Sequence, residues 1–436
     1  MQHKFGALDL IRAGLQDLDR ARTLFDELHN DGIDDDRNAA ATSHAGKSVR
    51  SRSSHSATWW TSIKVMQSQG KDFTNIIADE NSFVRLITVL GVSDEMGKLM
   101  RFRPELVEAA ANDACESHLY NHEQRRAHVL KSVGADPNDH TMPTASLPLA
   151  EAATALRKTY RKQLAAIMAQ DATANDPIEI QPRISTELSD LADAALEGAL
   201  AIARHEVDGS EHVRFAIIGM GKLGAQELNY VSDVDLIYVV EPADMDTNGM
   251  ALSRIGTKMA TTLQRVCQSV IMGVAEPTLW QIDGGLRPEG KEVRWYADSN
   301  PTSLLRAMGG NWEFQALLKA RPVAGDTDLG QAYMDMTRPF VWTASKRDNF
   351  VYDCQQMRKR VEDLIPNPLK TAKSNSAGEA CATSNSPCRC SNSCTAAPTK
   401  HCVPAPHSNP CRPWPKAGTS HANKPRNFHG TTDSNV

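Results

Sequence analysis

The sequence has no run of about 18 apolar residues, the length that a helix needs to cross a bilayer. Its first residues, MQHKF at 1–5, contain no apolar signal core. It also has little excess charge, because the formal net charge is -5 and the isoelectric point is about 6.3. We therefore expect a cytoplasmic protein with no membrane partner, and the charge gives no basis for nucleic acid as the main partner.

The spacing C-x-x-C, which is typical of zinc modules, does not occur. The chain nevertheless has nine cysteines, and three of them are scattered through sequence with helical periodicity. The other six lie in the last 70 residues: Cys381, Cys388, Cys390, Cys394, Cys402 and Cys411. The sequence between these six is rich in Ser, Pro, Asn and Thr and has almost no apolar periodicity, so we do not expect a metal module there.

The 436 residues are enough for two or three domains. Residues 1–70 form a poorly defined N-terminal segment, since early helical spacing gives way to a run rich in Ser, Arg and His. Apolar residues recur at helical spacing through 71–207 and predict a helical region. Residues 208–366 combine strand and helix patterns, whereas 367–436 form a low-complexity tail.

One helix of the helical region should break near Asp208 and Gly209, because glycine commonly ends helices. Its predicted apolar face consists of Leu188, Leu191, Ala195, Ala199 and Ile202. We interpret this face as core rather than as a partner surface.

The most informative stretch runs from 215 to 240 and reads FAIIGMGKLGAQELNYVSDVDLIYVV. It predicts a buried strand over 215–218, a glycine turn over 219–224, a short helix to Leu228 and a second strand over 232–240. Side chains alternate along a strand, so the acids within the second strand should project from one side.

These acids are Asp233 and Asp235. Two carboxylates that share a small volume repel each other unless a cation neutralises them, and hard oxygen ligands suit Mg²⁺. The pair therefore predicts a metal site.

The glycine turn GMGKLG at 219–224 also fits the dinucleotide fingerprint G-x-G-x-x-G, which would indicate an NAD(P)-binding Rossmann oxidoreductase. The spacing argues against this alternative. A parallel crossover needs about a dozen or more residues, and here the next apolar strand begins soon after Leu228. That strand also begins with two acids, whereas the second strand of a Rossmann unit ends with one acid that binds the ribose.

Three segments of the chain carry longer motifs. They are GMGKLG, ELNY and SDVDLI within 219–237, WQIDGGLRPEGK at 280–291, and NWEFQALLKARP at 311–322. Together they resemble the bifunctional glutamine synthetase adenylyltransferase and adenylyl-removing family over roughly residues 70–366. The resemblance implies an α+β fold, with a polymerase-β-like nucleotidyltransferase sheet flanked by helical regions.

The resemblance further implies that Asp233, Asp235 and Asp283 hold two Mg²⁺ ions, with Asp283 at the end of a short predicted strand over 279–283. Candidate contacts for phosphate or nucleotide are Gly219, Gly221, Lys222, Gly224, Ser232, Arg287, Lys319 and Arg321. The glycines let backbone N–H groups approach a phosphate. Ser232 could equally cap its strand. The basic residues after the acids could simply balance them, so Lys222 is the preferred cationic contact.

Members of the family carry two such units in a longer chain, one removing and one adding AMP. This chain has one unit after a helical region, which corresponds to the AMP-removing N-terminal half. The implied reaction is phosphorolysis of the bond between AMP and a tyrosine of glutamine synthetase. The implied partners are glutamine synthetase, ATP, ADP and phosphate, with a nitrogen-signalling regulatory protein as a further candidate. A fragment that keeps the fold but turns nothing over is the alternative from another class.

Two segments depart from the family's pattern. VRWY, which opens the segment 293–310, and TAKS at 371–374 are what the family's codons would give if they were read one base late. We interpret 293–310 and 367–436 as frameshifted readouts in a truncated chain. This interpretation explains the clustered cysteines without any metal.

Overall fold

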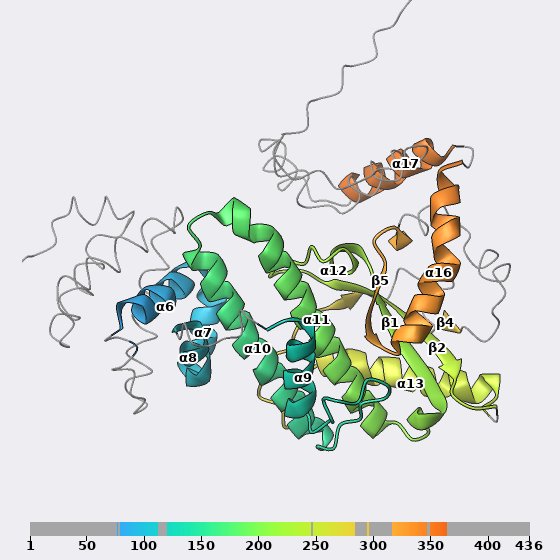
Figure 1. The fold of residues 1–436 in the computed structure, drawn as a ribbon, viewed down its shortest axis with the longest axis horizontal. Coiled ribbons are helices and arrows are strands. Elements are labelled where there is room, and N and C mark those ends of the chain that lie inside the picture. Colours follow the sequence, from blue (N-terminus) through green and yellow to red (C-terminus); the bar gives the residue numbers. More distant parts are fainter. Residues whose placement is uncertain are drawn as a thin grey trace, which may run out of the picture.

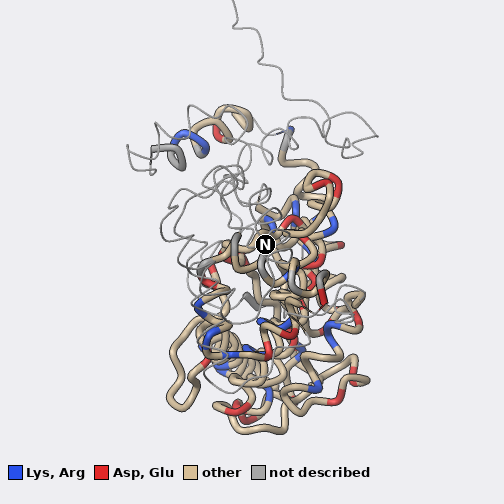
Figure 2. Tube along the Cα trace, turned by 90° about the vertical axis from the view of Figure 1, so that its left-hand side faces the viewer, with Lys and Arg blue, Asp and Glu red and all other residues tan. Residues whose placement is uncertain are grey.

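The computed structural model describes residues 76, 79–111, 120–245, 247–283, 294–295, 316–346 and 349–363. The predicted segments 1–70 and 367–436 and the candidate contact Arg287 lie outside these residues. Within the described ranges, no helix is long and apolar enough to cross a membrane. Figure 2 shows acidic and basic residues interspersed along the described chain.

Six helices make up the N-terminal part of the described chain. They are α6 Glu80–Val92, α7 Asp94–Phe102, α8 Pro104–Ala111, α9 His122–Ser132, α10 Leu149–Thr173 and α11 Pro177–Glu206. Side-chain caps start several of them; for example, Asn121 and Gln124 form a reciprocal capping box at α9. The long helices α10 and α11 pack together, and α6 to α8 lie beside α10, away from the sheet (Figure 1).

The predicted helix break is confirmed, because α11 ends at Glu206 and Gly209 has a left-handed φ of 82°. A short 3₁₀ turn, η2 Ser210–His212, then leads into the sheet. One hydrophobic core nevertheless runs through α9, α10, α11 and the sheet. The boundary that we predicted between the helical region and the following domain, at 207 and 208, therefore falls in a turn, and the same hydrophobic core includes residues on both sides of it.

The sheet contains β1 Val213–Gly219, β2 Val234–Pro242, β3 Ile282–Asp283, β4 Arg294–Trp295 and β5 Arg321–Gly325 among the described residues. Its order is β3-β2-β1-β5, and β4 also pairs with β2. β1 runs antiparallel to β2 and β5, whereas β3 and β4 run parallel to β2. The described chain is thus a mixed α and β fold. β4 is the described part of the segment 293–310 that we interpret as frameshifted.

Helices cover both faces of the sheet (Figure 1). These helices include α13 Gly249–Gln268 on one face and α16 Thr327–Thr343 on the other. A 3₁₀ turn, η3 Ala344–Lys346, follows α16 and leads to α17 Phe350–Asp363, which lies beyond the end of α16. Leu236, Tyr238 and Val240 of β2 pack in one core with residues of α11 and α13, whereas Ile237 and Val239 pack in a second core with residues of α16 and α17. This alternation is the period of two that a strand imposes.

The Rossmann alternative is wrong, because β1 and β2 are antiparallel neighbours joined through a helix of four residues, α12 Gly221–Gly224. A dinucleotide fold would need a long crossover helix between parallel strands. The predicted helix to Leu228 was also too long. It ends early because Gln226 has a φ of 56°, and because the N–H groups of Gln226 and Glu227 bond back to the carbonyls of Leu223 and Lys222 in a Schellman motif.

Two strand predictions need smaller corrections. β2 begins at Val234 rather than at 232, so Asp233 precedes the strand instead of lying within it. The strand predicted over 279–283 is reduced to Ile282–Asp283.

Candidate active site

Two of the three acids predicted to bind metal lie side by side at one edge of the sheet. Asp235 of β2 and Asp283 of β3 are register partners on adjacent parallel strands, directly after the pair Val234 and Ile282. Val234 and Ile282 both belong to the core formed with α11 and α13. Since side chains alternate, the two carboxylates project from the opposite face, the one that packs on α16.

The third predicted ligand, Asp233, is exposed and lies just before β2. Its neighbour Ser232 is half-buried. Within the part of the chain that the structure describes, no three His, Cys, Asp or Glu side chains gather closely enough to hold a metal ion. The backbone thus brings two of the three predicted ligands side by side, and Asp233 is not clustered with them.

The glycine turn leaves the sheet directly beside the acids. Gly219 ends β1, and the N–H of Met220 donates to the carbonyl of Asp235 at 2.8 Å. Gly221 then has a left-handed φ of 55°, which an L side chain adopts only with strain. Gly221, Lys222 and Leu223 open α12, and the first N–H groups of a helix have no intrahelical acceptor. The sequence therefore places backbone donors next to the acid strand.

Gly224 is needed for close packing. A Cβ at this position would lie 2.0 Å from the carbonyl oxygen of Lys319 and 2.5 Å from that of Gly219. Only glycine lets the turn approach both backbones so closely. The predicted turn glycines are therefore structurally explained at Gly221 and Gly224, whether or not they also contact phosphate.

The predicted basic contacts fall into two groups. Lys222 is half-buried on the turn. Lys319 and Arg321 instead meet acids of the protein: Lys319 Nζ lies 2.6 Å from Glu227 Oε2, and Arg321 Nη1 lies 2.7 Å from Asp193 Oδ2. Both residues thus pair with acids other than Asp233, Asp235 and Asp283, the acids that we expected them to balance.

The sequence reasoning missed a row of buried polar residues on α11. Ser189, Asp193 and Glu197 recur at intervals of four within the helix whose apolar face had been recognised. Each bonds the sheet or the segment that follows the glycine turn: Ser189 Oγ accepts from Leu228 N at 3.3 Å, and Glu197 Oε2 accepts from Gly325 N at 2.6 Å. The spacing of four was the signal that could have revealed this row.

The surroundings of Asp193 include two further titratable groups. His122 of α9 has Nε2 at 3.6 Å from Asp193 Oδ2, and the interaction with this carboxylate raises the pKa of His122. Burial raises the pKa of Asp190, whose Oδ1 accepts from Gln226 Nε2 at 3.2 Å. The residues that contact the end of the glycine turn thus belong to a cluster of interacting charged groups, which includes His122, Asp190 and Asp193.

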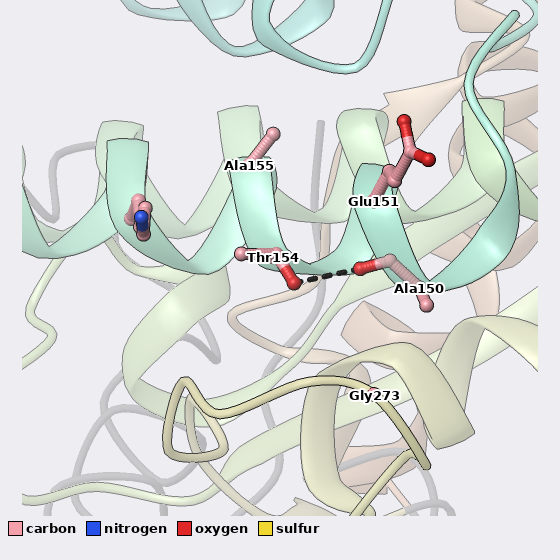
Figure 3. Close-up of a pocket in the computed structure, with 6 residues that line it drawn as sticks. Ala150, Glu151, Thr154, Ala155 and Gly273 are labelled. Atoms are coloured by element: carbon pink, nitrogen blue, oxygen red, sulfur yellow. Dashed lines mark hydrogen bonds between the residues drawn. The ribbon is translucent and has the colours of Figure 1, made fainter.

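A separate pocket of about 340 Å³ lies between α10 and the loop after α13 (Figure 3). Its lining consists of Ala150, Glu151, Thr154, Ala155, Lys158 and Gly273. The Thr154 hydroxyl already donates to the carbonyl of Ala150 at 2.7 Å. None of the predicted site residues contributes to this pocket, so it is not the site described above.

The fold and this edge define a class: a protein with a small mixed sheet that presents a carboxylate pair beside a tight glycine turn, supported by helices on both faces. Residues 83–336 match the family model described as glutamate-ammonia ligase adenylyltransferase. The match covers more than half of the chain, and the chain belongs to this family.

Curated relatives agree with this assignment. A protein of Bifidobacterium longum (strain DJO10A) is 68% identical over 373 residues, covering 84% of this chain and 34% of the relative. A protein of Cutibacterium acnes is 35% identical over 369 residues, covering 82% of this chain and 36% of the relative. Both are named bifunctional glutamine synthetase adenylyltransferase/adenylyl-removing enzyme. The chain spans about a third of the length of these relatives.

Proposed function

We propose that this chain contains a nucleotidyltransferase unit that removes AMP from glutamine synthetase by phosphorolysis. The observation that carries the proposal is the register of Asp235 with Asp283 next to the glycine turn. Such an arrangement suits a reaction at phosphorus, where negative charge must be neutralised and phosphate oxygens must be held. The names of the relatives include both removal and addition of AMP.

The donor set fits a hard divalent cation, because it consists of carboxylates on adjacent strands. Asp235 and Asp283 would hold Mg²⁺. Asp233, which precedes β2 and is not clustered with them here, is the third ligand that we expect for the two ions. Mg²⁺ bound there would polarise the phosphoryl oxygens and neutralise the charge that develops on them.

The protein's own residues have distinct tasks in this proposal. In the reaction a phosphate oxygen bonds to the phosphorus of AMP, the bond from that phosphorus to the tyrosine oxygen breaks, and the tyrosine regains a proton. ADP and unmodified glutamine synthetase are the products. The N–H groups at Gly221 and Lys222, with the Lys222 side chain, would hold the phosphate, and Ser232 would hold one further oxygen.

Several finer assignments belong to this proposal as well. Arg287 is a further candidate for the nucleotide. ATP would be a substrate for the addition reaction of longer family members, and a nitrogen-signalling regulatory protein would act on the helical part.

The test is ADP release from adenylylated glutamine synthetase in the presence of Mg²⁺ and phosphate. We expect Asp235→Asn to lower the rate by about 100-fold or more, because it removes one charge from the carboxylate pair. Asp208→Asn is the matched control. Asp208 is exposed and precedes the N-terminal end of β1, whereas the glycine turn follows the C-terminal end of that strand. Binding of glutamine synthetase without any turnover would identify a non-catalytic fragment and refute the enzymatic proposal.

A further inference from the structure

Arg321 lies on the wrong face of the sheet for a direct contact with the acids. Its side chain bonds Asp193 of α11, so Arg321 points toward the face that packs on α11 and α13. The carboxylates of Asp235 and Asp283 project from the other face. Arg321 nevertheless begins β5 beside Gly219, at the same edge of the sheet.

The side chain of Arg321 joins two elements. Its Nη1 donates to Asp193 Oδ2 at 2.7 Å and its Nη2 to Asp193 Oδ1 at 3.3 Å. The same Nη2 donates to the carbonyl of Leu223 at 3.2 Å. Asp193 is fully buried on α11, which makes it a fixed anchor, and the two-pronged geometry is one that lysine cannot reproduce.

The carbonyl of Leu223 is also an acceptor within the Schellman motif that ends α12, where it receives the N–H of Gln226 at 3.1 Å. At its other end the turn is bonded to the acid strand through Met220 and Asp235. The turn is thus held at one end by the strand that carries an acid and at the other by Arg321.

We propose that Arg321, anchored on Asp193, is a positioning residue that fixes the glycine turn relative to the acids, and is not itself a phosphate ligand. The effect that this inference predicts on nucleotide binding and catalysis rests on the proposed function. The charges that face the anchor are His122 of α9 and Asp190 of α11. Lys319, which precedes β5, pairs with Glu227 after the turn.

The experiment uses the full chain with two single variants, Arg321→Lys and Asp193→Asn, and the pair combined. Arg214→Lys is the matched control. Arg214 also forms a two-pronged pair with a carboxylate, Asp326, at 2.7 and 3.0 Å, but it lies near the start of β1, away from the turn. The measurements are hydrogen exchange of the peptide covering 220–227, the affinity for ADP with Mg²⁺ by calorimetry, and Tm.

We expect both single variants to speed exchange at 220–227 and to weaken ADP binding by about tenfold. The double variant should be no worse than either single one, because each removes the same anchor. Arg214→Lys should change neither quantity.

A direct ligand role makes the opposite prediction for Asp193→Asn. Release of Arg321 from its carboxylate would then leave ADP binding unchanged or stronger, and this result would overturn the inference. A loss of Tm with unchanged ADP affinity would also overturn it, since it would show a merely structural pair. If the unmodified chain binds no ADP and turns nothing over, the proposed function fails, and hydrogen exchange alone decides whether Arg321 anchors the turn.

Discussion

Replacement of Gly224 by alanine adds one methyl group where two backbones meet. The new Cβ would lie 2.0 Å from the carbonyl oxygen of Lys319 and 2.5 Å from that of Gly219, whereas real Cβ atoms essentially never approach within 3.0 Å. Both neighbours are backbone atoms of β strands or their flanks, so no flexible side chain can yield. The turn and β5 must therefore separate by about 1 Å.

The separation has two costs. Overpacking of this kind destabilises a protein by about 3 kcal/mol, which corresponds to a decrease in Tm of about 6–12 °C for a domain of this size. A displacement of about 1 Å between the turn and the acid strand should also lower the rate of ADP release by about 100-fold. The hydrogen bond from Met220 N to the carbonyl of Asp235 joins the turn to the acid strand, so such a shift would lengthen it.

The matched control is Gly249→Ala. Gly249 is the first residue of α13, and a Cβ there meets no atom within 4 Å. We expect its Tm and its rate of ADP release to stay close to those of the unmodified chain, since alanine is compatible with a helix. A Gly224→Ala chain that melts and reacts like the Gly249→Ala chain would refute the claim that close backbone packing requires this glycine.

Two further predictions follow from perturbed pKa values. Asp193 raises the pKa of His122 above its ordinary 6.5, so His122 contributes stability below that value and loses the contribution as the pH rises through its folded pKa. His122→Gln should therefore lower Tm more at about pH 6 than at about pH 9, and an equal loss at both would contradict this. Burial raises the pKa of Cys267 to about 12, so iodoacetamide should label its peptide in urea but hardly in the native chain at about pH 8, as mass spectrometry can check.

Local sequence patterns were enough to predict the elements that form the candidate site. The apolar and acidic positions in 232–240 predicted a strand, which β2 confirms from Val234 onward. Of the two acids expected within it, β2 contains Asp235, whereas Asp233 precedes the strand. The glycine pattern predicted a tight turn, which the structure contains. The predicted ends of the elements were less accurate. The end of α12 depends on the left-handed conformation of Gln226, and glutamine is not a residue type that predicts this conformation.

The roles of the basic residues could not be predicted in the same way. Arg321 and its partner Asp193 are separated by 128 positions, and their pairing depends on how α11 crosses the sheet. Asp193 sits within a helix whose apolar residues dominate its pattern, so its burial looks unfavourable until the cation from β5 is in place. Tertiary packing determines the partners of such residues, and a short stretch of sequence carries no information about that packing.

The placement of Asp283 also depends on contacts that precede it in the chain. Ile282 N donates to Gln268 Oε1 at 2.8 Å, and Val234 N donates to the carbonyl of Gln281 at 3.0 Å. Arg161 of α10 holds the loop before it by donating to the carbonyl of Thr278 at 2.6 Å. These bonds fix β3 from its N-terminal side. The register of Asp283 with Asp235 is thus supported by contacts with the helices α10 and α13.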